Sequence, residues 1–362
     1  MTDPIKIYFH IGSGKTGTST IQAFLNNNRK ILFSDHSCLY PNTGARGKNY
    51  AQGDCRNHVG FFKNNDNTEI IQGIRDFIAF SREKKIKNIV FSWEGLFERP
   101  RFARIIRDAI EGFDDIRPYI LLYLRRQDHW LESAWKQWFA MKKEYADFDH
   151  FVHTYEIRWK DFLTIWSDYF GIDQIIVQPY ESVQLEEGLI ENFLKKTGIE
   201  YKGNYWIEVE KQDYNLGLSE EIIEILHLNR NYYPEGDSSE LQNFFSNSLP
   251  DTYRKKPYEK YSLISPRQRI EILRQYEPVN RYIAEHFLKR ADGRLFYEPW
   301  PSGNEPWERP KGITAETMVP IFAYLIYSMV SRREKSIWVR MRETIKINIK
   351  YYFWKFSRNK KS

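Results

Sequence analysis

The sequence predicts an α/β fold with a mostly parallel central sheet flanked by helices, followed by a helical C-terminal region. Three observations support this prediction. Short apolar runs alternate with amphipathic stretches over the first 200 residues, the first run ends at a glycine-rich loop, and the pattern becomes purely helical after residue 200. Strands that alternate with helices are typical of parallel sheets covered on both faces.

Four apolar runs are predicted to be the strands. Their apolar residues are continuous rather than alternating with polar ones, as expected for strands that are buried on both faces. The runs are Ile5–Ile11, Asn88–Ser92, Pro118–Leu124 and Ile172–Pro179.

Helical periodicity fills most of the intervals between and after these strands. The predicted helices are Thr18–Leu25, Glu69–Lys85, Arg101–Gly112, His129–Met141, Glu187–Thr197, Leu218–Asn229, Ser265–Leu288 and Ala315–Val330. Residues 34–68 are rich in Asn, Gly and Asp, which predicts a long loop region with short elements. We therefore expect an α/β core over residues 1–200, a helical part over 201–330 and a tail over 331–362.

Composition and cysteine usage favour a cytoplasmic protein. The two cysteines, Cys38 and Cys55, match no zinc-binding spacing, and one bridge at most would be unusual in a secreted protein of this length. No basic and then apolar signal segment opens the sequence. The uncharged stretch Met318–Val330 is too short to cross a bilayer, so we expect it to form a buried helix.

The positive charge of the chain is concentrated in its last residues. The whole chain carries a formal charge of +6, whereas residues 331–362 contain eleven Lys or Arg and two Glu, a net charge of +9. Apolar residues recur there at intervals of three and four, at Trp338, Met341, Ile345, Ile349, Tyr352 and Phe356. Two interpretations stay open: a basic amphipathic helix on an anionic membrane surface, or a last helix packed on the body. No nucleic-acid-binding module accompanies the tail, so nucleic acid is not an expected partner.

A strand, a loop and a helix predict an anion-binding site at His10–Thr20. Glycines allow close backbone approach, the first N–H groups of a helix point at the ligand, and Lys15 adds a positive charge. A Walker A loop would require glycine at position 9, which is Phe9. An ATP-dependent kinase of the P-loop type is therefore the weaker alternative.

The segment HIGSGKTGTSTIQAFL resembles the 5′-phosphosulfate loop of sulfotransferases that use PAPS (3′-phosphoadenosine-5′-phosphosulfate), above all bacterial and carbohydrate-modifying members. This resemblance implies a three-layer, P-loop-like fold. It also implies that the loop residues hold the 5′-phosphosulfate, namely Gly14, Lys15, Thr16, Gly17, Thr18, Ser19 and Thr20.

A second segment is similar to the 3′-phosphate site of the same family. Arg125 ends a predicted strand and Ser133 follows eight residues later on the next helix. A guanidinium pairs with phosphate in a bidentate manner, and a hydroxyl adds a neutral donor. Tyr180 and Glu181, after the fourth strand, are a weaker similarity. Many family members have Trp at the position of Thr20, so the resemblance here favours saccharide acceptors over small phenols and steroids.

Two residues are candidates for the base that removes the acceptor's proton. Glu94 follows the second strand, at the end of a parallel sheet where ligands bind, and the resemblance also points to this position. His58 is the alternative because imidazole titrates near neutrality. His10 is expected to be a packed residue, and the spacing of Trp135 and Trp138 favours a core-facing stripe. Lys15 is expected to contact the leaving oxygen, and no metal is expected.

The resulting hypothesis is a sulfotransferase that moves a sulfuryl group from PAPS to a hydroxyl or amine and releases PAP (3′,5′-adenosine bisphosphate). The resemblance favours a saccharide or glycolipid acceptor, modified in the cytoplasm or at the inner membrane face. A catalytically silent nucleotide-binding module docked at a membrane is the alternative from another class. The sequence does not indicate an oligomeric state.

Overall fold

The computed structural model describes residues 3–44, 50–200, 206–208, 218–232, 242, 244–245, 248–249, 262–310 and 312–330. The chain divides into two compact units. The first comprises Met1–Trp135, Phe148–Asn215 and Ser262–Arg309, and the second comprises Lys136–Asp147, Leu216–Tyr261 and Pro310–Ser362. The functional division at residues 200 and 330 stays a prediction.

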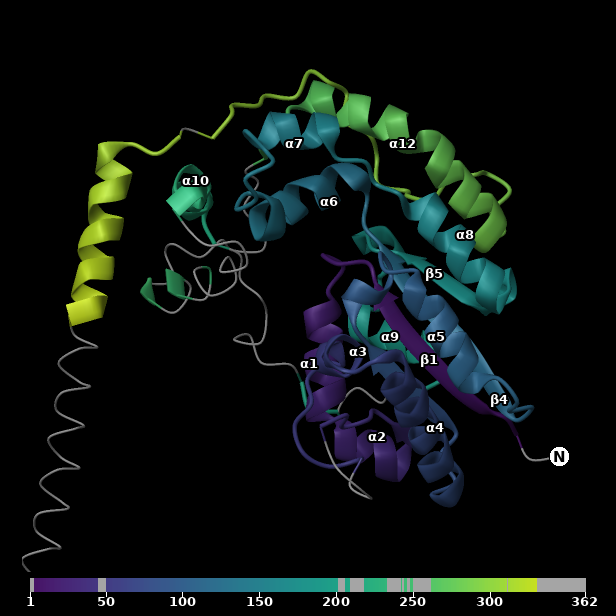
Figure 1. Cartoon of the computed structure of the whole chain (residues 1–362). Helices are drawn as coiled ribbons and strands as arrows, with labels where there is room; N and C mark the ends of the chain where they lie inside the picture. The colour runs from purple at the N-terminus through teal and green to yellow at the C-terminus, as the bar shows by residue number, and fades with distance from the viewer. Residues whose placement is uncertain are drawn as a thin grey trace, which may run out of the picture. The chain divides into compact units, whose positions relative to one another are not determined.

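A five-stranded parallel sheet forms the centre of the first unit (Figure 1). Its strand order is β2-β3-β1-β4-β5. The strands are β1 (Ile5–Gly12), β2 (Cys38–Leu39), β3 (Asn88–Ser92), β4 (Ile116–Leu124) and β5 (Ile175–Pro179). The chain builds one side of β1 first and then the other, so the carboxyl end of β1 is the switch point where parallel sheets bind ligands.

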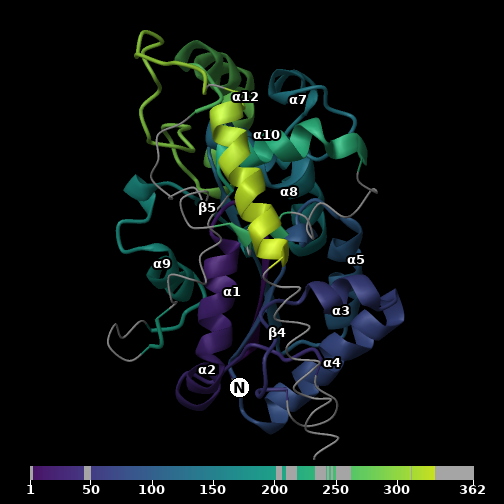
Figure 2. The same cartoon turned by 90° about the vertical axis from the view of Figure 1, so that its left-hand side faces the viewer.

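Helices cover both faces of this sheet (Figure 2). One layer packs on Tyr8, Val90 and Tyr123; its helices are α1 (Thr18–Asn27), α2 (Arg29–Asp35) and α9 (Leu189–Lys196). The opposite layer contains α3 (Val59–Asn64), α4 (Asn67–Glu83), α5 (Arg101–Ile110) and α8 (Trp159–Phe170). There the ring of Phe91 contacts Phe61 of α3 and Phe77 of α4. The predicted three-layer α/β architecture with a parallel sheet is thus confirmed.

Further helices lie at the carboxyl end of the sheet. They are α6 (Gln127–Ala134), which continues into a π-helical turn, η2 (Trp135–Phe139), then α7 (Phe148–Thr154) and the long α12 (Pro266–Phe287). Contacts join α12 to both α6 and α8. Ser265 and Gln268 form a capping box that begins α12. Trp135 is buried against Phe148 and Phe151, as its spacing predicted. Trp138, the other member of the predicted stripe, is only partly buried.

The first unit also contains three short 3₁₀ helices, η1 (Glu94–Leu96), η3 (Ile172–Gln174) and η4 (Ser182–Gln184). The predicted strands and most predicted helices are confirmed within a few residues. Helices α2, α7 and α8 were not predicted. Strand β2 and helix α3 lie in the region predicted to contain short elements.

The second unit contains α10 (Glu220–Leu228), η7 (Arg230–Tyr232) and a helix over residues 315–330. Lys136 Nζ pairs with Glu220 Oε1 at 3.0 Å, and the Ile313 amide donates to Glu224 Oε2 at 3.1 Å. No helix in the described part of the chain is long and apolar enough to cross a membrane.

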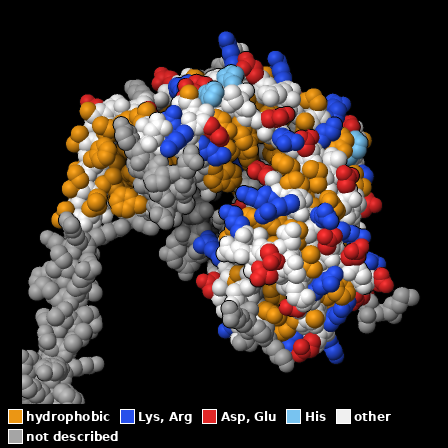
Figure 3. All heavy atoms as spheres, in the orientation of Figure 1, with side chains coloured by type: hydrophobic (Ala, Val, Ile, Leu, Met, Phe, Trp, Pro, Cys, Tyr) orange, Lys and Arg blue, Asp and Glu red, His pale blue; other side chains and the backbone are white. Residues whose placement is uncertain are grey.

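The helix over residues 315–330 is not buried, so that part of the prediction is wrong. Ile321 and Leu325 are buried, but the other apolar side chains are largely exposed, as the orange surface of this helix in Figure 3 shows. An apolar composition indicates that a helix can bury its surface, but it does not identify the surface against which the helix is buried. The predicted tail over 331–362 lies outside the described residues.

Candidate active site

The predicted anion loop lies between the end of β1 and the start of α1. Gly17 is the N-cap of α1 and has left-handed backbone angles, φ 76° and ψ 15°. A Cβ atom at Gly17 would lie 2.3 Å from Leu189 Cδ2 and 3.4 Å from Tyr180 Oη. Glycine is therefore required here both by the backbone conformation and by the close packing of neighbouring side chains.

Hydrogen bonds from neighbouring elements fix the loop. The Trp130 indole N–H donates to the Gly14 carbonyl at 3.1 Å, and the Thr16 hydroxyl donates to the Ser13 carbonyl at 2.5 Å. The Ser13 amide donates to the Tyr123 carbonyl of β4 at 2.8 Å. Because Trp130 belongs to α6 and Tyr123 to β4, the loop is held by the same elements that carry Arg125 and Ser133.

The hydroxyl residues of the loop open the first turn of α1. Thr18 is buried, and its Oγ1 has no hydrogen-bond partner within the described part of the chain. Ser19 and Thr20 are half-buried. A buried hydroxyl without a protein partner at a helix N-terminus is what a bound anion would satisfy.

The predicted phosphate residues Arg125 and Ser133 are brought together. Arg125 follows β4, and its Nη1 lies 3.3 Å from the Lys15 carbonyl oxygen and 3.5 Å from Ser133 Oγ. Burial lowers the pKa of Arg125, while Tyr180 opposes the shift. A guanidinium stays charged at neutral pH, so this site presents a desolvated positive charge.

Lys15 belongs to the same cluster of charges. Its φ is 68°, and it is half-buried in the loop. Burial lowers its pKa to about 8; the charge of Arg125 adds to the shift and the charge of Glu94 opposes it. The charge of the Lys15 ammonium therefore interacts with Arg125, the candidate phosphate ligand, and with Glu94, the candidate base.

Glu94 begins η1, two residues after the end of β3, and adjoins the loop. A Cβ atom at Gly12, the last residue of β1, would lie 2.7 Å from the Glu94 carbonyl oxygen. The Glu94 carboxylate accepts a hydrogen bond from Gln22 Nε2 at 3.1 Å, and Gln22 also donates to Ser92 Oγ at 3.2 Å. This amide of α1 orients one carboxylate oxygen, Oε2.

The two histidines near the site are fully buried. His58 Nδ1 accepts from the Ser92 amide at 2.9 Å, so Nε2 carries the proton and donates to the Pro41 carbonyl at 2.9 Å. Burial lowers the pKa of His58 to about 4 and that of His10 to about 3. His10 Nδ1 shares a hydrogen bond with Ser92 Oγ at 2.9 Å, which agrees with its expected packed position.

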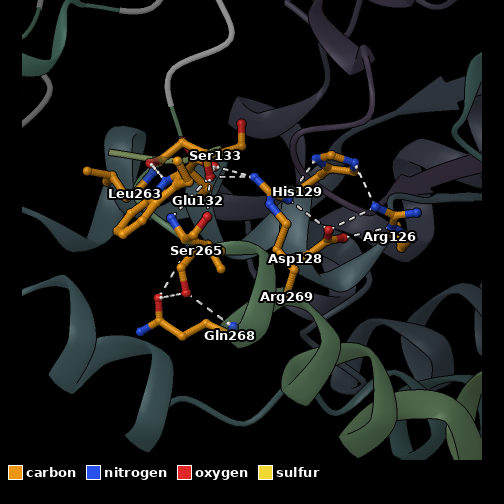
Figure 4. Close-up of polar contacts among 12 residues, drawn as sticks. Arg126, Asp128, His129, Glu132, Ser133, Leu263, Ser265, Gln268 and Arg269 are labelled. Atoms are coloured by element: carbon orange, nitrogen blue, oxygen red, sulfur yellow. Dashed lines mark hydrogen bonds and ion pairs between the residues drawn. The ribbon is translucent and has the colours of Figure 1, made fainter. Parts of the chain in front are cut away.

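A network of charges, buried at Arg126 and Asp128, lies next to Arg125 and Ser133 and was not predicted (Figure 4). Asp128 binds Arg126 through two contacts of 2.9 Å and Arg269 of α12 through one of 2.8 Å. Arg269 also pairs with Glu132 at 3.2 Å, and His129 pairs with Glu298 at 3.1 Å. Arg126 and Glu132 are the chain neighbours of the two candidate phosphate residues, so the network positions both ends of α6.

Electrostatics favours the ionised form of Asp128. Burial by itself would raise its pKa, but the hydrogen bonds and charge of Arg126, with the charges of His129 and Arg269, hold the pKa well below its usual range. Sequence reasoning could have noticed the doublet of Arg125 and Arg126. Nothing in the sequence links these residues to Arg269, more than 130 residues later.

The weaker similarity at Tyr180 and Glu181 also lies at the site. Tyr180 packs on Gly17, and its amide donates to the Leu124 carbonyl at 2.6 Å. The carboxylate of Glu181 accepts from the amides of Tyr297 at 2.6 Å and Glu298 at 3.1 Å. Glu181 thereby joins β5 to the segment that carries Glu298.

Among the described residues, no group of His, Cys, Asp or Glu is arranged to hold a metal ion. Lys15 and Arg125 place positive charge at the carboxyl end of the sheet.

No family model matches the chain. A curated protein of Archaeoglobus fulgidus, described as uncharacterized, is 27% identical over 173 residues, which are 47% of this chain and 45% of that protein. The match thus spans about half the length of this relative.

Three solved structures are similar at low identity. The sulfotransferase from Alicyclobacillus acidocaldarius is 14% identical and covers 64% of this chain and 93% of its own, with a TM-score of 0.32. The sulfotransferase domain of the Synechococcus PCC 7002 olefin synthase is 12% identical over 69% of this chain and 98% of its own, with a TM-score of 0.29. The sulfotransferase domain from the curacin biosynthetic pathway is 11% identical over 76% and 97%, with a TM-score of 0.32.

Proposed function

We propose that this protein transfers a sulfuryl group from PAPS to an acceptor hydroxyl or amine and releases PAP. The observation that carries the proposal is the proximity of Arg125 to both the Lys15 loop and Ser133, at the switch point of a parallel sheet. One end of PAPS carries a phosphosulfate and the other a 3′-phosphate. Two adjacent anion sites of this kind fit such a donor.

In this proposal the loop from Gly14 to Thr20 binds the 5′-phosphosulfate, and Arg125 with Ser133 binds the 3′-phosphate. The unpartnered hydroxyl of Thr18 would donate to a bound oxygen. Lys15 stabilises the negative charge that develops on the leaving phosphate oxygen. Such fixed positive groups act most strongly at a site from which water is excluded.

Glu94 is the base that we propose for the reaction. The acceptor oxygen or nitrogen forms a bond to sulfur, its proton passes to the Glu94 carboxylate, and the bond between sulfur and the phosphate oxygen breaks. A base must reach the proton that it removes. Both ring nitrogens of the alternative base, His58, are engaged by backbone groups, whereas Glu94 is half-buried and held by Gln22. We therefore rank Glu94 above His58.

The proposed acceptor is a saccharide or glycolipid, an inference that rests on the family resemblance of the loop. We further propose a cytoplasmic location, in contact with the inner membrane face through residues 331–362. The proposed location rests on cysteine usage, because the chain has only Cys38 and Cys55 and could form one bridge at most.

Ligand-dependent thermal unfolding tests the nucleotide site. PAP is expected to raise the melting temperature of the wild-type protein, and the variants Lys15→Ala and Arg125→Ala are expected to lose this effect. Matched controls are Lys195→Ala and Arg104→Ala, because these side chains are 71% and 74% exposed. Stabilisation by ATP with magnesium but not by PAP would reject the proposal in favour of a kinase.

Transfer itself is tested with radiolabelled PAPS and fractions of cellular lipid and polysaccharide. We expect label in a saccharide-bearing fraction, and Glu94→Gln should abolish labelling while PAP still stabilises the protein. Binding of PAP without labelling of any fraction would support a catalytically silent module instead. A Glu94→Gln variant that transfers at the wild-type rate would remove Glu94 from the mechanism.

A further inference from the structure

The helix over residues 315–330 presents apolar side chains to solvent. Its exposed residues are Met318, Val319, Phe322, Tyr324, Ile326, Tyr327, Met329 and Val330. Ile326 is 62% exposed and Tyr327 is 69% exposed. Large contiguous apolar surfaces of this kind usually mark a site of interaction with a partner or a membrane.

The opposite side of the same helix is packed on protein. Ile321 is fully buried and Leu325 nearly so, and these residues are four positions apart on one helical face. The helix begins after a polar turn in which the Thr317 amide and Thr314 Oγ1 lie 3.4 Å apart. One apolar face of the helix is therefore packed on protein, and the other apolar face is free to bind a partner or a membrane.

The chemistry of this surface restricts the occupant. No residue from Met318 to Val330 is charged, so the surface offers no ion pair to a protein partner. Tyr324 and Tyr327 combine an apolar ring with a hydroxyl, the combination that is enriched where a bilayer meets water.

The charge of the chain that follows supplies the second argument. Residues 331–362 carry a net charge of +9, and Arg332, Arg333 and Lys335 come directly after the helix. An apolar helical face continued by a strongly basic segment is complementary to an anionic bilayer surface, where acyl chains accept the apolar side chains and headgroups attract the cations.

We propose that the exposed face of the helix over 315–330 inserts into the headgroup boundary of an anionic lipid surface. The helix lies in the plane of the surface, because its other face stays packed on protein. The proposal goes beyond membrane contact by residues 331–362 alone, because it assigns the apolar part of the membrane binding to the helix over residues 315–330. It does not depend on the proposed chemistry, so either can fail without the other.

Vesicle co-sedimentation of the full chain tests the proposal. Wild-type protein should bind phosphatidylcholine vesicles that contain phosphatidylglycerol, and bind pure phosphatidylcholine much less. The double variant Phe322→Glu/Ile326→Glu should bind at least about tenfold more weakly, since two apolar side chains lose their burial. Leu228→Glu is the matched control, because Leu228 of α10 is 59% exposed outside this helix, and it should bind like the wild type.

Other outcomes overturn the proposal. Unchanged vesicle binding by the double variant would leave the tail as the contact. A wild-type dimer in light scattering that the double variant converts to monomer would make a second copy the occupant.

Should the double variant fail to fold, an environment-sensitive NBD dye on Ile326→Cys decides the question. A blue shift on anionic vesicles is expected there, with none for the dye on Leu228→Cys. Absence of the shift at position 326 would reject the proposal.

Discussion

Lys15 is held in a state that is unfavourable for folding and favourable for anion binding. Burial and the charge of Arg125 both act against its protonated form, and Glu94 compensates in part. A bound phosphosulfate would add negative charge next to the Lys15 ammonium and would favour its protonated form. Sites that bind anions commonly retain such destabilising charges in the absence of ligand.

Replacing Lys15 with Met should stabilise the ligand-free protein by about 1–3 kcal/mol at pH 7, after allowance for its partial exposure. The pKa of Lys15 in the folded protein, about 8, lies below the ordinary lysine value of 10.5, so the free-energy penalty is complete below pH 8 and disappears as the pH rises toward 10.5. The difference between Lys15→Met and wild type should therefore shrink from pH 7 to pH 10, as urea unfolding would measure. A Lys15→Met variant that is less stable at every pH would contradict this account.

Gly17 combines two demands on a single residue. Substitution by alanine should cost about 1–2 kcal/mol for the left-handed backbone and further energy for displacing Leu189, and PAP binding should weaken. Gly112→Ala is the matched control, because Gly112 has a positive φ of 85° with nothing within 4 Å of its Cβ position. Urea unfolding of both variants, and of Gly17→Ala/Leu189→Ala, separates the two costs. No recovery in the double variant would exclude the steric contribution.

At the scale of elements, α6 is the critical unit of the candidate site. Its Trp130 indole donates a hydrogen bond to the predicted anion loop, and it carries Ser133. The ion pair between Asp128 and Arg269 joins it to α12. Breaking one partner of a buried ion network leaves other charges uncompensated, which costs far more than losing a surface pair. We therefore expect the placement of α6 and the binding of an anion to be coupled through this network.

The variant Asp128→Asn should destabilise the protein by about 3 kcal/mol at neutral pH and weaken PAP binding. Because the folded pKa of Asp128 is depressed, its contribution is present above the unfolded pKa of about 4 and is lost as the pH falls further. Urea unfolding between pH 3 and pH 7 should show the difference from wild type shrinking in acid. The control Asp161→Asn breaks an exposed pair with Arg158 and should change stability by less than about 1 kcal/mol. Equal losses of stability in Asp128→Asn and Asp161→Asn would show that the buried network contributes no more to stability than an exposed ion pair.

At the scale of the whole molecule, the candidate site residues all belong to the first compact unit. The proposed membrane surface belongs to the second. Nucleotide binding and membrane docking are therefore expected to be separable properties of one chain.

A chain that ends at Val330 should keep the full PAP-induced rise in melting temperature and lose most of its binding to anionic vesicles. The reason is that residues 331–362 carry charge for the membrane and no residue of the proposed nucleotide site. Thermal unfolding with PAP and vesicle co-sedimentation measure the two properties in parallel. Loss of the PAP effect on truncation would place the tail at the nucleotide site.

The strands and the loop could be predicted because their signals are local. A continuous apolar run such as Asn88–Ser92 indicates a buried strand, and a glycine-rich turn between a strand and a helix indicates the position of the loop. The anion-binding role of Lys15 stays a prediction. The charge network could not be predicted, since Asp128 and Arg269 meet through folding alone. Burial of Met318–Val330 was predicted wrongly, because an apolar composition does not show whether other parts of the chain pack on the helix.

The indole of Trp130 gives the candidate site an optical signal of its own. It is nearly fully buried, stacks on Tyr155 with a centroid distance of 5.6 Å, and donates to the Gly14 carbonyl. Any ligand that polarises the loop backbone changes the electric field along this hydrogen bond. Titration with PAP should therefore alter tryptophan emission in the wild-type protein and not in Trp130→Phe, which would let binding be followed in real time without a label.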